Sequence, residues 1–196
     1  MCVPSVIEAL RAATRSRHAR IASNPAMLRL FEPDYAIPEY HAHLGRLLGL
    51  FEPLERAAEY VGGRENPVCT LQRSNDLRED LLAMGAVARD IDGLERCARI
   101  PPITAQGLRG YTYVLLGSML GGRMIVKQLR AVLGQGASFC FYGGGHGEFE
   151  TAWASFREDL EENGRSDVEV ICSTAAAIFD AYADWLSEPP LRSGGA

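Results

Sequence analysis

The 196-residue sequence lacks the features typical of membrane, secreted and nucleic-acid-binding proteins. No apolar run reaches the roughly 18 residues of a membrane-spanning helix, and the N-terminus has no apolar core of a signal peptide. Basic residues are not in excess: the formal net charge is −5, which disfavours a general affinity for nucleic acid. We therefore expect a cytoplasmic protein with no membrane and no nucleic-acid partner.

Patterned cysteines, repeats and low-complexity tracts are also missing. The five cysteines are odd in number, widely scattered and form no CxxC pair, so neither a zinc site nor a disulfide framework is indicated. The 47% hydrophobic and 23% charged residues are close to globular averages, and the length suits one ordinary domain. We expect a single domain over residues 1–196, with residues 187–196 as a flexible tail.

Helix signals recur along most of the chain. Ser5 followed by Glu8 matches a capping box in front of apolar residues at helical spacing. Residues 37–63 predict a long helix that Pro53 either kinks or divides, and Gly85 predicts a left-handed helix end.

The longest expected break is "FCFYGGGHGEFE", residues 139–150, with two amphipathic segments after it. Few segments alternate as strands do. The predicted fold class is all-α: a single-domain bundle of roughly seven or eight helices.

One apolar segment, "YVLLGSMLGGRMIVKQL" from Tyr113 to Leu129, carries three glycines in a predicted helix. Each interior glycine costs about 0.5–1 kcal/mol relative to alanine. Gly117 and Gly121 are four residues apart and share a helix face, where their missing Cβ atoms permit a close approach. Either another helix packs closely there, or a ligand does.

A second pattern lies near the N-terminus, where Arg11, Arg15 and His18 are spaced to share one helix face. A planar ligand with a metal at its centre and carboxylates at its edge suits all three, because imidazole ligates metals and guanidinium groups pair with carboxylates. The alternative is a solvated basic face, since Arg17 and Arg20 are close by in the sequence.

The two patterns together resemble the heme oxygenase family. "LRAATRSRHARIASNPAMLRLF" is similar to the family's N-terminal helix, and "YVLLGSMLGGRM" to its distal helix with a glycine-rich kink. "DLREDLLAMG" and "FETAWASFREDL" match later segments in the same order, so the resemblance covers most of the chain. It implies a heme oxygenase-like bundle that holds heme between the first helix and the distal helix.

The resemblance also assigns roles to individual residues. His18 matches the proximal heme ligand, Arg11 and Arg15 match basic residues facing the heme propionates, and Arg157 matches a later residue with the same task. Gly117, Ser118 and Gly121 match the distal kink, so the resemblance makes them the predicted catalytic positions.

The implied reaction is that of the bacterial, biliverdin-producing members. Heme is both substrate and cofactor, and dioxygen and external electrons convert it into biliverdin, carbon monoxide and iron. The implied partners are an electron-donor protein, either a reductase or a ferredoxin, and a phytochrome that accepts biliverdin.

Two positions depart from the animal enzymes. Ser118 stands where they carry an Asp, as in a group of bacterial members that includes those associated with phytochromes, and Ala22 stands where they carry a Glu that bonds the proximal His. We expect Ser118 to act through water, because an unperturbed hydroxyl is a poor acid. These departures leave two alternatives open: a heme-binding or heme-sensing protein without turnover, and an all-α relative that binds another small molecule or a partner protein.

Overall fold

The computed structural model describes residues 5–63, 72–143 and 146–189, and within these ranges the chain forms helices and no strands, which confirms the all-α prediction. Residues 190–196, most of the predicted tail, lie outside the described residues. No helix in the described ranges is long and apolar enough to cross a membrane. The helices, in chain order, are α1 (Val6–Ala22), α2 (Pro25–Arg29), α3 (Ile37–Gly62), α4 (Arg73–Ala83), α5 (Ala88–Asp92), α6 (Leu108–Leu133), α7 (Cys140–Gly143), α8 (His146–Asn163) and α9 (Val168–Ser187), with short 3-10 turns at Gly134–Gly136 and Arg165–Asp167.

Local helix signals were predicted well. The Ser5 hydroxyl accepts a hydrogen bond from the Glu8 amide at 3.3 Å, and the Glu8 carboxylate accepts one from the Ser5 amide at 2.9 Å. Gly85 follows α4 with φ of 92°, in the left-handed region. Helix α3 continues through Pro53 without division. The predicted break at residues 139–150 was wrong in part. Helix α7 forms a turn within it, and α8 starts at His146, three residues before the predicted segment that begins at Phe149.

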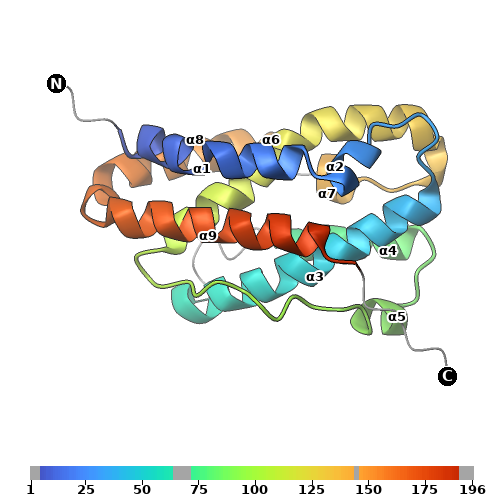
Figure 1. The fold of residues 1–196 in the computed structure, drawn as a ribbon, viewed down its shortest axis with the longest axis horizontal. Coiled ribbons are helices and arrows are strands. Elements are labelled where there is room, and N and C mark those ends of the chain that lie inside the picture. Colours follow the sequence, from blue (N-terminus) through green and yellow to red (C-terminus); the bar gives the residue numbers. More distant parts are fainter. Residues whose placement is uncertain (1–4, 64–71, 144–145, 190–196) are drawn as a thin grey trace.

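Helix α9 lies at the centre of the bundle, and α1 runs beside it in the same direction (Figure 1). Its side chains are buried on several sides, with Ile171, Ala175 and Ile178 at most 1% exposed. Two ion pairs join α1 to it: Arg17 to Asp180 at 2.8 Å and Arg20 to Asp184 at 2.6 Å. These pairs are partly exposed and worth under about 1 kcal/mol each, so they set the register while apolar burial supplies the stability.

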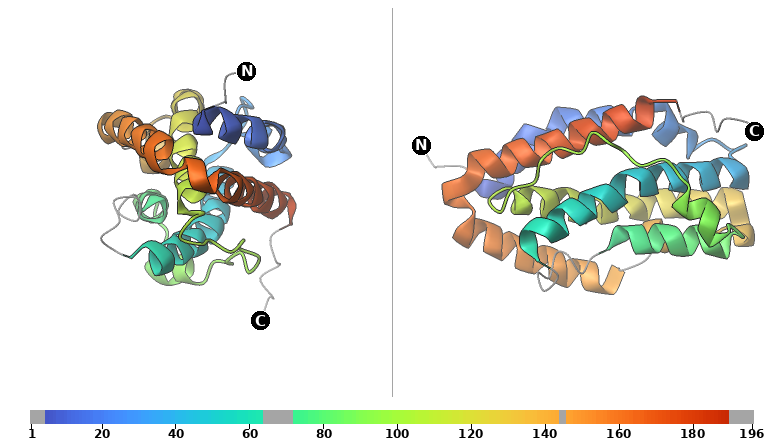
Figure 2. Two further views of the ribbon diagram at one scale, coloured as in Figure 1. Left: turned by 90° about the vertical axis from the view of Figure 1, so that its left-hand side faces the viewer. Right: turned by 90° about the horizontal axis from the view of Figure 1, so that it is seen from below.

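Helix α6 crosses α9 at very close range, and Figure 2 shows the bundle from its left-hand end and from below. A Cβ atom on Gly110 would lie 2.3 Å from the carbonyl oxygen of Ile171 and 3.0 Å from the amide nitrogen of Ala175. Any other residue at position 110 would push the two backbones apart. In Figure 1, α6 changes direction between its green first part and its yellow last part.

Helix α7 is a single turn that packs against both α4 and α6. Its Tyr142 hydroxyl lies 2.7 Å from Nε2 of His43 on α3, and both side chains are buried. Burial lowers the pKa of His43 to about 4, because the charged imidazolium loses its hydration.

His43 therefore gives the fold a predictable pH dependence. Its folded-state pKa lies below the ordinary 6.5, so the unfolded chain binds more protons between these values and stability falls as pH drops from 6.5 toward 4. We expect the unfolding free energy of the wild type, minus that of His43→Gln, to decrease across this range by roughly 2–4 kcal/mol.

Urea titrations at pH 7, 5.5 and 4.5 measure this difference. Glu55, whose pKa burial raises to about 7, is present in both proteins and its contribution cancels. A difference that stays constant with pH would contradict the buried, neutral state of His43.

Candidate ligand site between helices α1 and α6

The arginines of α1 divide between two faces. Arg17 and Arg20 pair with carboxylates of α9, as described above. Arg11 and Arg15 are exposed, and within the described ranges neither forms an ion pair. Two of the four arginines of α1 thus have structural partners, and the other two carry charge on a separate, exposed face. That exposure agrees with a ligand site and equally with the alternative of a solvated basic face.

His18 lies on the same face as Arg11 and Arg15. Its ring is exposed and stands edge-on to the ring of Phe179 on α9, with 6.0 Å between centroids and 67° between planes. No described residue hydrogen-bonds either ring nitrogen of His18. In this part of the chain, therefore, no side chain takes the place of the Glu that bonds the proximal His in the animal enzymes. The imidazole is free to ligate a metal from this face.

Gly117 and Gly121 of α6 face open space. A Cβ atom built on either glycine has no described atom within 4 Å, apart from those of its own helix turns. The neighbouring Gly122 behaves in the opposite way, because its Cβ atom would lie 2.7 Å from the carbonyl oxygen of Tyr142 in α7. Close packing against another helix thus explains Gly122, and no described helix packs against Gly117 or Gly121 in this way.

Two contacts join α6 to the N-terminal helices, and we call the stretch between α1 and α6 from one contact to the other the slot. At one end the hydroxyls of Thr14 and Tyr113 are 3.4 Å apart. At the other end the Gln128 amide donates to the carbonyl oxygen of Phe31, just after α2, at 3.3 Å. Residues 113–128 of α6 span roughly 22 Å at the helical rise of 1.5 Å per residue. Along this length α1 and α6 do not pack closely.

His18 and Gly117 lie at matching levels of this slot. Each is four residues, about one helical turn, beyond the contact between Thr14 and Tyr113. The chain also exposes large apolar side chains on α6 and around α2, which sequence analysis missed. Four large side chains are strongly exposed on α6 and around α2: Leu28 at 51%, Phe31 at 45%, Leu120 at 50% and Met124 at 76%. Leu120 and Met124 are three and seven residues after Gly117, a spacing that could have identified them.

Arg157 of α8 lies at the level of Arg11. The Ile7 amide donates to the Glu161 carboxylate at 3.3 Å, and α8 runs back alongside α1 (Figure 1). Arg11 is one turn beyond that contact on α1, and Arg157 is one turn before it on α8. Arg157 is exposed and forms no ion pair with a described residue, whereas the nearby Asp159 pairs with Arg109 at 2.8 Å.

Ser118 is half-buried, and its hydroxyl donates to the carbonyl oxygen of Leu115 in its own helix at 2.6 Å. This bond uses the only proton of the hydroxyl, so Ser118 can accept hydrogen bonds from water and has no free donor. The local helix bond that is common for serine is thus present, and it limits what this side chain can contribute to a bound ligand.

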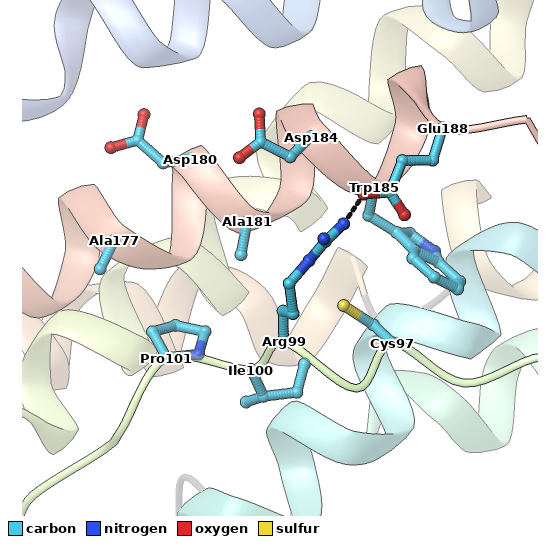
Figure 3. A pocket seen from close by; sticks show the side chains of 10 residues that line it. All are labelled: Cys97, Arg99, Ile100, Pro101, Ala177, Asp180, Ala181, Asp184, Trp185 and Glu188. Atoms are coloured by element: carbon cyan, nitrogen blue, oxygen red, sulfur yellow. Dashed lines mark ion pairs between the residues drawn. The ribbon is translucent and has the colours of Figure 1, made fainter.

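A second hollow lies between α9 and residues 97–101 (Figure 3). Its carboxylates are already paired, Asp180 and Asp184 with arginines of α1 and Glu188 with Arg99. None of the predicted site residues lines it. We assign it no function, because it offers no uncompensated charge.

The fold defines a class of protein: an all-helical bundle in which a long glycine-rich helix runs past the first helix. Comparison with known proteins agrees. The sequence profile of the heme oxygenase family matches residues 5–188, so the chain belongs to the heme oxygenase family.

Two solved structures share this fold. The heme oxygenase from Leptospira interrogans superposes with a TM-score of 0.74 at 21% identity, over 95% of this chain and 100% of that one. Heme oxygenase-1 from the cyanobacterium Synechocystis sp. PCC6803, in complex with heme, gives 0.69 at 15% identity, over 93% and 91%. The search of curated proteins found no significant match to the sequence.

We expect one added methyl group to change the unfolding free energy in opposite directions at the adjacent glycines Gly121 and Gly122. Gly121→Ala should raise the unfolding free energy of the ligand-free protein by about 0.5–1 kcal/mol, because alanine favours helix and the methyl meets open space. Gly122→Ala should lower it by about 1–3 kcal/mol, because the methyl collides with the backbone of α7.

Denaturant unfolding of both variants without ligand measures these signs, and hemin titration measures binding. We expect Gly121→Ala to bind hemin more weakly despite its higher stability. Equal stability changes in the two variants would contradict the division of these glycines between slot and packing.

Proposed function

We propose that this protein is a heme oxygenase that opens heme at a meso carbon and releases biliverdin, carbon monoxide and iron. The proposal includes dioxygen, electrons from an external reductase or ferredoxin, a phytochrome as biliverdin acceptor, and a cytoplasmic location. The observation that carries it is the pair of bare glycines, Gly117 and Gly121, that face open space at the level of His18. An enzyme that uses dioxygen beside a flat ligand needs such room, and a simple structural helix does not.

The residues present fit heme as a substrate. His18 offers an unbonded imidazole nitrogen as the iron ligand. Arg11, Arg15 and Arg157 form no ion pair with a described residue and lie around the end of the slot marked by Thr14 and Tyr113, where they would pair with two propionates in charge-assisted hydrogen bonds. The exposed side chains of Leu28, Phe31, Leu120 and Met124 would cover the apolar faces of the ring.

Bound heme supplies the iron that activates dioxygen, and the chain supplies the surroundings. Gly117 and Gly121 leave room beside the ring that any larger side chain would fill. Ser118 holds a water by accepting its hydrogen bond, because its own proton is committed to Leu115. Protons would therefore reach the site through water, with Ser118 as an anchor and not as the acid.

The second candidate is a heme-binding or heme-sensing protein that does not turn over. The bond from Ser118 to Leu115 favours it, because the position that carries Asp in the animal enzymes then has no free donor. Both candidates use His18 and the arginines in the same way, so only the chemistry after binding separates them.

One assay separates the candidates. Purified protein is mixed with hemin, ascorbate or a ferredoxin system and air, and the visible spectrum is followed. We expect the Soret band to decay while a bile-pigment absorption grows. A Soret band that persists under reduction supports the non-catalytic binder, and the absence of any Soret shift on adding hemin excludes both.

His18→Ala tests the iron ligand. We expect loss of the histidine-ligated ferric spectrum and about tenfold or greater loss of hemin affinity, because a metal-ligand bond is removed. His41→Ala on α3 is the control, since it removes one histidine and leaves the slot unchanged. Wild-type spectra in His18→Ala would assign the ligand to another residue.

A double substitution tests the propionate contacts. Arg11→Ala with Arg15→Ala should weaken hemin binding by about thirtyfold to a thousandfold, at roughly 1–2 kcal/mol for the charged hydrogen bond that each arginine loses, or change the biliverdin isomer by letting the ring rotate. The control is Arg17→Ala with Arg20→Ala, which removes the same charge from the same helix but acts on α9. Equal effects of the two double variants would show that only the net charge matters.

A further inference from the structure

The glycine-rich segment of α6 packs against a helix, α7, that is too short to be stable on its own. Helix α7 comprises only Cys140–Gly143, and one isolated helical turn has no stability of its own in water. Yet its Tyr142 carbonyl lies directly against Gly122, and its Gly143 is so close to Val126 that a Cβ atom there would be 3.1 Å from that side chain. Something outside α6 must hold α7 in place.

Two buried charged residues of α4 hold it. Asp80 is fully buried and accepts hydrogen bonds from the amides of Cys140 at 2.6 Å and Phe141 at 2.9 Å. Arg73, which is 3% exposed, donates to the carbonyl oxygen of Phe141, and its guanidinium lies 4.3 Å from the centre of that ring.

Both charges act on the backbone of the same turn. Asp80 satisfies two amides that have no partner within so short a helix, and Arg73 satisfies a carbonyl. The hydrogen bond between the Tyr142 hydroxyl and Nε2 of His43 attaches the same turn to α3. Helix α7 is thus fixed by polar contacts to α4 and α3, and α6 in turn abuts it at Gly122.

We propose that Asp80 and Arg73 are positioning residues for the glycine-rich part of α6. By holding α7, they set how far the backbone at Gly121 and Gly122 stands from the slot, although neither residue lines it. The consequence for heme rests on the proposed function, whereas the consequence for the helix does not. Adjacent glycines have separate tasks here, since Gly122 receives the support and Gly121 presents bare backbone to the ligand.

Hydrogen–deuterium exchange of the heme-free protein tests the mechanical part. Asp80→Asn keeps the side-chain volume but replaces one acceptor oxygen with a donor. We expect amide exchange in residues 117–126 to accelerate about tenfold or more through local opening, while residues 108–114, which are packed on α9, stay unchanged.

The matched control is Glu55→Gln, a half-buried carboxylate of α3 that accepts hydrogen bonds from the start of α4, at the backbone of Arg73 and Ser74, and forms no hydrogen bond with a described residue of α7. It should leave exchange in residues 117–126 unchanged. Unaltered amide exchange in Asp80→Asn would overturn the proposal. So would an equal acceleration in Asp80→Asn and Glu55→Gln that extends over residues 108–114 as well as 117–126. If Asp80→Asn fails to fold, Arg73→Lys, which keeps the charge near Asp76 but shortens the reach to Phe141, is measured against the same control.

Hemin gives the second readout. We expect Asp80→Asn, and not Glu55→Gln, to weaken hemin binding severalfold and to alter the ratio of biliverdin isomers, while the histidine-ligated spectrum persists. If the wild type binds hemin without turnover, the proposed function fails and the exchange experiment still decides the role of Asp80. If exchange responds but neither hemin affinity nor the isomer ratio does, α7 supports the fold alone and the positioning role is excluded.

Discussion

The close crossing of α6 and α9 at Gly110 is the constraint on which the slot depends. Helices α1 and α6 touch through Thr14 and Tyr113 but do not otherwise pack closely, so α9 largely determines how they lie relative to each other. Gly110 sets the distance from α6 to α9, and the ion pair of Arg17 with Asp180 sets the register of α1 on α9. A shift at this crossing would change the width of the slot without altering any residue in it.

The glycines of α6 explain why this helix accepts a poor helix former several times. Gly110 and Gly122 are each in contact with a neighbouring backbone, of α9 and of α7, and these two contacts hold the helix at both ends of its open segment. A Cβ atom on Gly117 or Gly121, which lie between them, would meet no described atom of another helix within 4 Å. The helix thus forgoes a few kcal/mol of intrinsic propensity, and it gains two tight supports and a bare surface between them.

Much of the fold could be predicted from local patterns, because capping and helix termination depend on neighbours in the chain. The capping box of Ser5 and Glu8 and the left-handed Gly85 are of this kind. Helix α7 could not be predicted, because its turn forms only where Asp80, sixty residues earlier, reaches its amides. The exposure of large apolar side chains was also missed, since the exposure of Met124 depends on packing and not on hydropathy.

The sequence by itself determined the family, through the resemblance of its motifs, and the helical class, through residue type and helical spacing. The roles of the candidate site residues stay predictions. Only the tertiary structure decided which residues of a pattern share a task. It divided the arginines of α1 between ion pairs with α9 and an exposed face, and it separated Gly121 from Gly122. The physical reason is that periodicity defines a helix face, whereas what that face meets depends on helices distant in the chain.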